Sequence, residues 1–169
     1  FNKDVKEKFK LRSQIIQQVR NFFLKHDFLE VETPILQPIP GGATARPFKT
    51  HMNDLDVDLY LRVAPELYLK RLLISGIGKV FEMGKSFRNE GMDREHNPEF
   101  TMLEAYAAYK NYEWMMPFIE ELLGELAKNL FNAAELEIKE RVINFKGPFE
   151  RIEFNKLLEK HADINYDES

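Results

Sequence analysis

The chain has 169 residues, of which 44% are hydrophobic and 12% aromatic, an ordinary balance for one globular domain with a real core. Its 24 basic and 28 acidic side chains give a formal net charge of −4, so it has no basic footprint for binding nucleic acid by itself. The lack of cysteine excludes disulfides and Cys-ligated zinc, and no apolar run approaches the length of a membrane span. We predict an intracellular, cytoplasmic protein whose ends are cut, because the chain lacks both a signal peptide and an initial methionine.

The first fifty residues alternate between helical and irregular patterns. From Asp4 to Lys25, apolar residues recur at three- and four-residue steps, which predicts one amphipathic helix or two abutting ones. Residues 28–33 then alternate as a strand, which Pro34 ends. Residues 39–47 contain prolines and two adjacent glycines, which predicts irregular backbone. There, Gly42 is either a turn residue or a place where the backbone closely approaches a ligand.

The clearest strand pattern runs from Leu55 to Val63. Its apolar residues alternate with polar ones that include Arg62, so we predict one face in the core and one in water. A helix is then predicted from residue 64 to about Ser75, with Gly76 beyond its end. Glu66 falls in its first turn, where the helix dipole is sufficient to favour a carboxylate.

Residues 80–109 predict two extended segments joined by a charged loop. Alternation separates an apolar face, containing Phe81 and Leu103, from a face that we predict to be wet. The wet face comprises Glu82, Ser86, Arg88, Glu90, Phe100, Met102, Glu104 and Tyr106. The connecting loop, residues 91–98, is too long for a tight turn and is typical of a binding loop. We therefore expect Arg88 and Glu104 to project into one shared cavity.

The last sixty residues show structural patterns only. A helix is predicted from Asn111 to about Leu130, with Pro117 in its first two turns. Short strands at 135–138 and 141–145, a turn at 147–148 and a helix at 154–160 follow, with His161 at the surface. No boundary or flexible linker is visible, so we predict a single α+β domain over 1–169, an antiparallel sheet flanked by helices.

The charged hairpin carries a resemblance to a known family. Phe87-Arg88-Asn89-Glu90-Gly91, followed by residues 96–104 (HNPEFTMLE) and Tyr106, resembles motif 2 of class II aminoacyl-tRNA synthetases in the form found in lysyl-tRNA synthetases. Residues 39–48 (IPGGATARPF) and 64–72 (APELYLKRL) are similar to the same family. The predicted helix and strand before Pro34 resemble motif 1, which implies a homodimer. The resemblance implies part of the class II catalytic fold and ATP-dependent activation of L-lysine for transfer to tRNA(Lys).

The resemblance also implies site residues. Those for ATP are Arg88, Glu90, His96, Asn97 and Phe100, and those for lysine are Gly42, Glu66, Arg88, Glu104 and Tyr106. Arg88 is the expected catalytic residue, since a planar guanidinium can grip a phosphate and a carboxylate oxygen together. Glu104 and Tyr106 share a face and suit the terminal ammonium of the substrate.

The chain departs from the family pattern at its far end. It contains no motif 3, the glycine-rich stretch with an ATP-binding arginine. We expect the Mg²⁺ ligands and the contacts to tRNA to lie outside this chain, no metal site within it, and little or no adenylation by the chain alone.

Two rival functions remain open from the sequence. The nearest is a synthetase-like ligase that attaches lysine to a translation elongation factor, which shares residues 96–104 but is expected to have a larger aromatic residue in place of Ala105. The other is a non-catalytic synthetase-like regulator, which the intact Arg88, Glu90, His96 and Phe100 disfavour. Aspartyl- and asparaginyl-tRNA synthetases share the fold but differ in the motif 2 loop.

Overall fold

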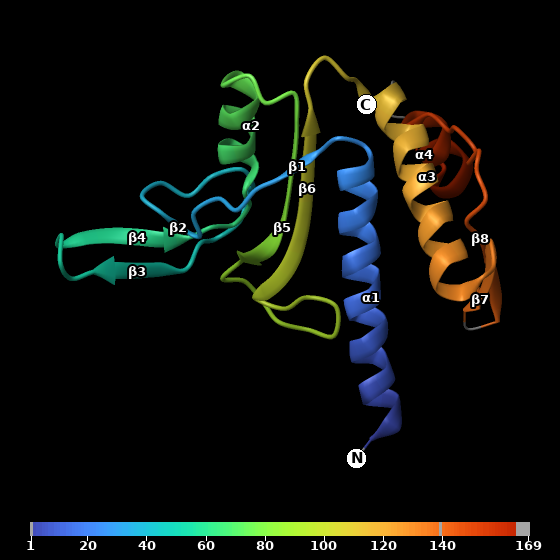
Figure 1. Ribbon diagram of the computed structural model, residues 1–169, viewed down its shortest axis with the longest axis horizontal. Coiled ribbons are helices and arrows are strands. Elements are labelled where there is room, and N and C mark those ends of the chain that lie inside the picture. Colours follow the sequence, from blue (N-terminus) through green and yellow to red (C-terminus); the bar gives the residue numbers. More distant parts are fainter. Residues whose placement is uncertain (1, 139, 165–169) are drawn as a thin grey trace. The chain divides into compact units, whose positions relative to one another are not determined.

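The computed structural model describes residues 2–138 and 140–164, which form two compact units, Phe1–Lys110 and Asn111–Ser169. The single domain over 1–169 stays a prediction. The mixture of helices and largely antiparallel sheets confirms the predicted α+β class (Figure 1).

The central sheet of the first unit has the strand order β1-β5-β6. The strand β1 (Leu29–Glu30) runs parallel to β5 (Lys79–Phe87), and β6 (Glu99–Ala107) runs antiparallel to β5. The register places Glu82 opposite Glu104 and Ser86 opposite Phe100. Directly opposed side chains point to one face, so the alternation predicted for this hairpin is confirmed.

A second sheet has the order β2-β4-β3 and comprises β2 (Leu36–Gln37), β3 (Lys49–Met52) and β4 (Val57–Leu61). The strand β4 confirms the extended pattern between 55 and 63, whereas β3 was not predicted. In Figure 1, the β3–β4 hairpin projects away from the central sheet. This projection explains why Leu55 and Val57, which alternation assigns to the core, are exposed at 63% and 40%.

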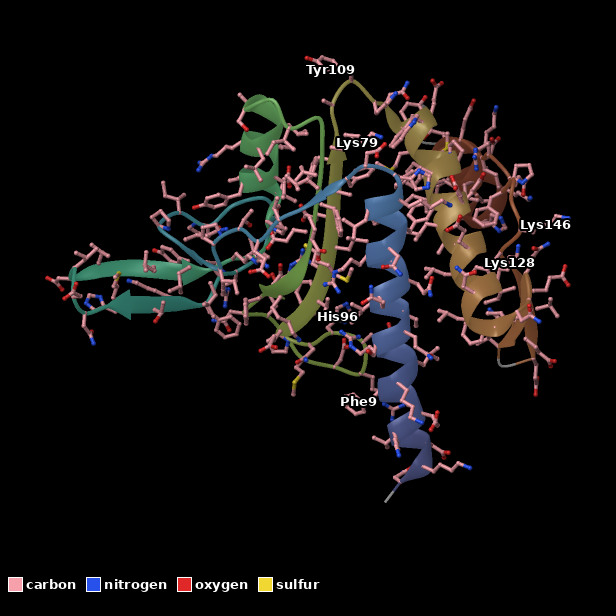
Figure 2. All side chains as sticks on the ribbon, in the orientation of Figure 1. Phe9, Lys79, His96, Tyr109, Lys128 and Lys146 are labelled. Carbon is pink, nitrogen blue, oxygen red and sulfur yellow. The ribbon has the colours of Figure 1, made fainter. Side chains whose placement is uncertain are left out.

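One continuous helix, α1 (Lys3–Lys25), covers the apolar face of the hairpin. Its Phe23 ring stacks on Phe81 with centroids 4.9 Å apart, and Arg12 donates to the hydroxyl of Thr101 at 2.8 Å. The N-terminal half of α1 leaves apolar side chains in water, with Phe9 70% exposed (Figure 2). The amphipathic pattern thus forms a single helix, only part of which is used by this unit.

The opposite face of the hairpin is covered as well, so the prediction that it is wet is wrong for several residues. Glu82 and Ser86 are buried at 3% and 0% exposure, and Arg62, which alternation also assigns to water, is buried at 2%. The cause is a second layer of chain, because Phe87 donates its backbone N–H to Arg62 O at 2.9 Å. Helix α2 (Glu66–Ile74) follows this layer, close to the predicted bounds.

A buried ion pair joins the layers. The Arg62 guanidinium pairs with the Glu82 carboxylate and also donates to Lys85 O at 2.7 Å. Thr33 completes the network, since its hydroxyl donates to the second Glu82 oxygen at 2.6 Å and its carbonyl accepts from Arg62 at 3.2 Å. The segment after β1, the end of β4 and β5 are therefore joined by one set of charged hydrogen bonds.

The second unit consists of α3 (Tyr112–Phe131), a hairpin of β7 (Glu135–Ile138) and β8 (Arg141–Asn144), and α4 (Phe154–Ala162). All four were predicted. Asn111 caps α3 by accepting from Trp114 N at 3.1 Å, and Pro117 lies inside the helix. No helix among the described residues is long and apolar enough to cross a membrane.

Substituting Glu82 tests the buried ion pair. We expect Glu82→Gln to lower the free energy of unfolding by about 3–5 kcal/mol, because it leaves the buried Arg62 charge unpaired. The measurement is urea denaturation. The control is Glu7→Gln, which removes the exposed pair with Lys10 and should cost less than about 1 kcal/mol. Equal, small effects of the two substitutions would contradict the structural role given to Arg62 and Glu82.

Candidate functional site

The loop between β5 and β6 encloses a hollow of about 350 Å³. All five residues predicted to bind ATP line it, together with three loop neighbours: Arg88, Glu90, Gly91, Glu95, His96, Asn97, Pro98 and Phe100. The sequence separates these residues by up to twelve positions, and the β5–β6 ladder brings the two ends of the loop together. The structure therefore gathers the predicted ATP residues around one space.

Arg88 enters this hollow directly after β5. Its backbone N–H donates to Pro98 O at 2.9 Å, which extends the ladder by one step and fixes where the side chain leaves the backbone. The guanidinium carbon lies 5.1 Å from the centre of the Phe100 ring. The Arg88 Nε is buried and has no hydrogen-bond acceptor among the described residues. A buried donor without an acceptor is costly.

Asp93 organises the loop, although the sequence analysis did not single it out. One of its carboxylate oxygens accepts from the backbone N–H groups of Glu95 and His96, both at 2.7 Å. The carboxylate also contacts His96 Nδ1 at 2.8 Å. These hydrogen bonds lower the pKa of Asp93 to about 2. Short-range bonding of this kind is typical of aspartate in turns. The spacing Asp-x-x-His is the sequence feature from which these contacts could have been predicted.

Glu90 links the loop to the irregular segment 38–48. One of its carboxylate oxygens accepts from Arg46 N at 3.2 Å, and the Asn89 N–H donates to Arg46 O at 2.8 Å. Glu90 also lines an adjoining, more open hollow between residues 43–46 and 89–91. Glu90 therefore lies where two segments that are distant in the sequence meet.

Four of the five residues predicted to bind lysine, all except Arg88, form a second group beside α2. Tyr106 donates its hydroxyl to Glu104 at 3.0 Å. Gly42 lies against Glu66, because a Cβ on Gly42 would lie 3.0 Å from Glu66 Cβ. The φ of +90° at Gly42 adds to this constraint, since side-chain-bearing residues rarely adopt it. Glu104 and Glu66 are close enough to interact electrostatically.

Burial raises the pKa of the Glu104 carboxyl above its usual range, and the nearby carboxylates of Glu66 and Glu82 add to the rise. The Tyr106 hydroxyl and the Arg62 guanidinium oppose it. The pKa of Tyr106 is raised by burial and by its hydrogen bond to Glu104. A half-buried acid among other acids is destabilised in its charged form, and an incoming cation would relieve that destabilisation.

The two groups share one face of the hairpin. Even spacing along β6 puts Phe100, Glu104 and Tyr106 on the same face of the strand. The guanidinium of Arg88 lies over Phe100. Phe100 and Glu104 are four strand positions apart, or roughly 13 Å. The structure thus places Arg88 and Glu104 on one side of the sheet. The hollow described above is lined by residues from Arg88 to Phe100, and Glu104 is not among them. A single cavity containing both stays a prediction.

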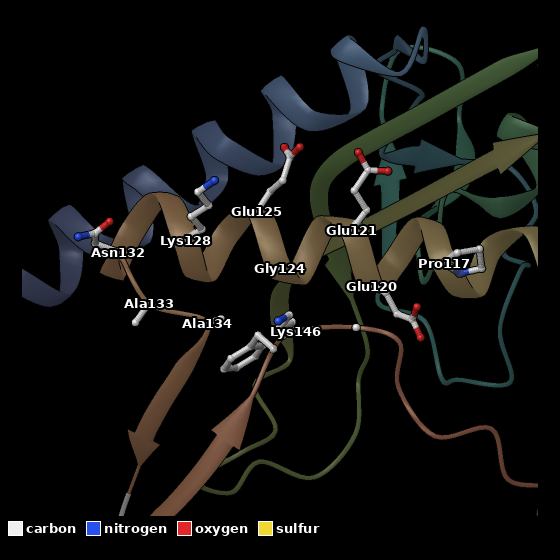
Figure 3. Close-up of a pocket in the computed structure, with 12 residues that line it drawn as sticks. Pro117, Glu120, Glu121, Gly124, Glu125, Lys128, Asn132, Ala133, Ala134 and Lys146 are labelled. Carbon is white, nitrogen blue, oxygen red and sulfur yellow. The ribbon is translucent and has the colours of Figure 1, made fainter.

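The described residues contain no group of three or more His, Cys, Asp or Glu side chains placed to hold a metal ion. The second unit has a hollow of its own, of about 560 Å³, beside α3 (Figure 3). In that hollow Glu120 is already engaged by Arg151 and by Phe149 N, and no predicted site residue lines it.

A family model described as "tRNA synthetases class II (D, K and N)" matches residues 1–169. Among curated relatives named lysine–tRNA ligase, one from Wolinella succinogenes is 56% identical over 163 residues, covering 96% of this chain and 32% of the relative. One from Pseudomonas savastanoi is 52% identical over 164 residues, covering 96% and 33%. One from Psychrobacter arcticus is 51% identical over 166 residues, covering 98% and 32%. The chain spans about a third of the length of these relatives.

The Asp93 contacts predict a pH-dependent loop. The pKa of Asp93 in the folded protein lies below its ordinary value of 3.8, so its bonds are fully present above that value and are lost as the pH falls through about 2. We expect the NMR amide shifts of Glu95 and His96 to titrate with a midpoint near 2. Asp93→Asn, which keeps an acceptor oxygen, should remove the titration but retain the amide bonds. A midpoint at or above 3.8 would contradict this role.

Proposed function

Because the chain belongs to the class II tRNA synthetases (D, K and N), we propose that it forms part of the catalytic domain of an enzyme that activates L-lysine with ATP and transfers it to tRNA(Lys). The names of its relatives support this substrate over the modification of an elongation factor. The observation that carries the proposal is the hollow lined by all five predicted ATP residues, with the Arg88 guanidinium over the Phe100 ring.

In the proposed reaction, a carboxylate oxygen of lysine attacks the α-phosphorus of ATP and pyrophosphate leaves. A new oxygen–phosphorus bond forms as the bond to the leaving pyrophosphate breaks, and negative charge grows on the phosphate oxygens. Arg88 stabilises that charge and aligns the two reactants, because its planar fork can hold a phosphate and a carboxylate oxygen at fixed geometry. The ladder bond to Pro98 and the Phe100 ring hold the guanidinium in position beforehand.

The remaining loop residues bind the nucleotide. Phe100 supports the adenine ring by stacking, Glu90 accepts from the adenine amino group, and Asn97 braces the loop. His96 contacts the outer phosphates through its ring. Asp93 engages Nδ1 of that ring, which leaves Nε2 as the nitrogen for the phosphates. The hydrogen bond from Arg46 to Glu90 connects nucleotide binding to the segment that contains Gly42.

The amino-acid end uses the second group. Glu104 and Tyr106 bind the terminal ammonium of lysine, while Glu66 and the Gly42 backbone bind the α-ammonium. A neutral side chain in place of the ammonium would leave the half-buried Glu104 charge unpaired, and sites of this kind reject such analogues strongly. The raised pKa of Glu104 agrees with a carboxyl that lacks its cation.

Further parts of the proposal depend on the rest of the protein. The Mg²⁺ ligands, the motif 3 arginine and the tRNA contacts are assigned to segments outside residues 1–169. The exposed apolar side chains Val5, Phe9 and Ile15 on α1 support a homodimer through this helix, as the motif 1 resemblance implies. We place the enzyme in the cytoplasm, where tRNA charging supports translation.

Substituting Arg88 tests the proposed chemistry. In a full-length protein that carries this chain, Arg88→Ala should lower the rate of lysine-dependent ATP–pyrophosphate exchange by about 10²- to 10³-fold, the usual cost of one lost charge-stabilising donor. The matched control is Arg94→Ala, which removes an exposed arginine from the same loop and should change the rate by less than threefold or so. Comparable activity in the two variants would refute the role of Arg88.

Substituting Glu104 tests the amino-acid site. We expect Glu104→Gln to raise the dissociation constant for lysine by roughly 10- to 100-fold, because a charged hydrogen bond is lost. Calorimetry should also show that lysine binds more weakly to the unmodified protein as the pH falls through a range above the ordinary carboxyl pKa, since protonation removes the charge. A variant that binds lysine normally would rule out Glu104 as the ligand of the terminal ammonium.

A further inference from the structure

The ammonium group of Lys70, on a side chain that is about half exposed, lies beside two residues of the proposed amino-acid site, Glu66 and Tyr106. It pairs with one oxygen of Glu66, the residue assigned to the α-ammonium of the substrate. It also lies 5.9 Å from the centre of the Tyr106 ring, which belongs to the group assigned to the terminal ammonium. Lys70 therefore contacts both ends of the proposed lysine site.

Pairs of glutamate and lysine four residues apart on a helix are common and weak. Two observations separate Lys70 from an ordinary surface pair. Its ammonium extends over Tyr106, on another element, and this places it between two groups that bind cations in the proposed function. The second Glu66 oxygen lies on the side of Gly42, because a Cβ there would be 3.6 Å from it. Glu66 thus meets Lys70 and Gly42 with different oxygens.

The charges around the site explain why a resident cation is useful. Glu104 interacts electrostatically with Glu66 and with Glu82, and the Arg62 guanidinium is engaged by Glu82, Thr33 and Lys85 O. Lys70 is left to neutralise Glu66. An incoming α-ammonium must share or replace the contact between Lys70 and Glu66. An amine without a carboxylate has no group that can pair with Lys70, so the Lys70 ammonium would then face a second cation.

We propose that Lys70 exchanges partners when the substrate binds. The α-ammonium of the amino acid pairs with Glu66, and one oxygen of the α-carboxylate, attached to the same carbon, pairs with Lys70 while the other oxygen faces Arg88. Lys70 is then a specificity-determining residue that disfavours diamines, which resemble lysine but lack the carboxylate. This inference rests on the proposed function, because it deepens the assignment of Glu66 to the α-ammonium.

The test compares lysine with 1,5-diaminopentane, which is lysine without its α-carboxylate. Isothermal calorimetry on a full-length protein that carries this chain would measure both dissociation constants for the unmodified protein, Lys70→Met and Lys70→Arg. We expect Lys70→Met to reduce the preference for lysine over the diamine by about threefold to fivefold, the strength of an exposed ion pair. Lys70→Arg keeps the charge and should retain the preference.

The ratio of the two dissociation constants decides the outcome. An unchanged or increased preference for lysine in Lys70→Met, or an equal loss in Lys70→Arg, would overturn the exchange. Glu66→Gln distinguishes this failure from failure of the proposed function. If Glu66→Gln leaves lysine binding unaltered, then the amino-acid site itself is wrongly assigned. If it weakens both ligands while Lys70→Met leaves the ratio unchanged, only the role of Lys70 is wrong.

Discussion

The buried pair of Arg62 and Glu82 is the interaction on which the arrangement of the first unit depends. Two opposite charges are taken out of water, and further hydrogen bonds surround them. Arg62 is bonded to Lys85 and Phe87 in β5, and Thr33, after β1, is bonded to both Arg62 and Glu82. Desolvating two ions is costly unless such additional hydrogen bonds are made. The network fixes the layer above the hairpin and holds Glu82 directly opposite Glu104. Arg62 thereby joins the stability of the fold to the electrostatics of the site.

Much of this unit could be predicted from local patterns. The period of α1 and the alternation of β5 and β6 depend only on which residues face a common partner, and that information is present in the sequence order. Alternation, however, says which side chains share a face and not what covers it. Alternation therefore assigns Arg62, Glu82 and Ser86 to water, because the covering layer comes from segments that are 20 to 49 residues from Glu82 along the chain. Strand β3, with the sequence Lys-Thr-His-Met, has no apolar alternation to reveal it.

In the candidate site too, some features could be predicted from the sequence and others only from the structure. Family resemblance selected the five ATP residues that the structure gathers around one hollow, and their roles stay predictions. Asp93 and Lys70 escaped notice because charged residues in a loop and on a helix are usually solvated, and their contacts are set by geometry rather than composition. Asp93 bonds to His96, three residues further along the chain, whereas Lys70 lies against Tyr106 on a different element. A contact between near neighbours can be predicted from a sequence motif, but a contact between distant elements can be found only in the three-dimensional structure.

The close approach of Gly42 to Glu66 also has consequences for engineering. A side chain at Gly42 would meet the Glu66 stem at 3.0 Å from a backbone conformation that disfavours it, so random libraries at this position would yield few folded members. Glu104 and Tyr106 lie on a regular strand with its hydrogen bonds supplied by β5. Laboratory evolution toward unnatural amino acids with altered side chains should therefore diversify the strand and leave the glycine segment intact.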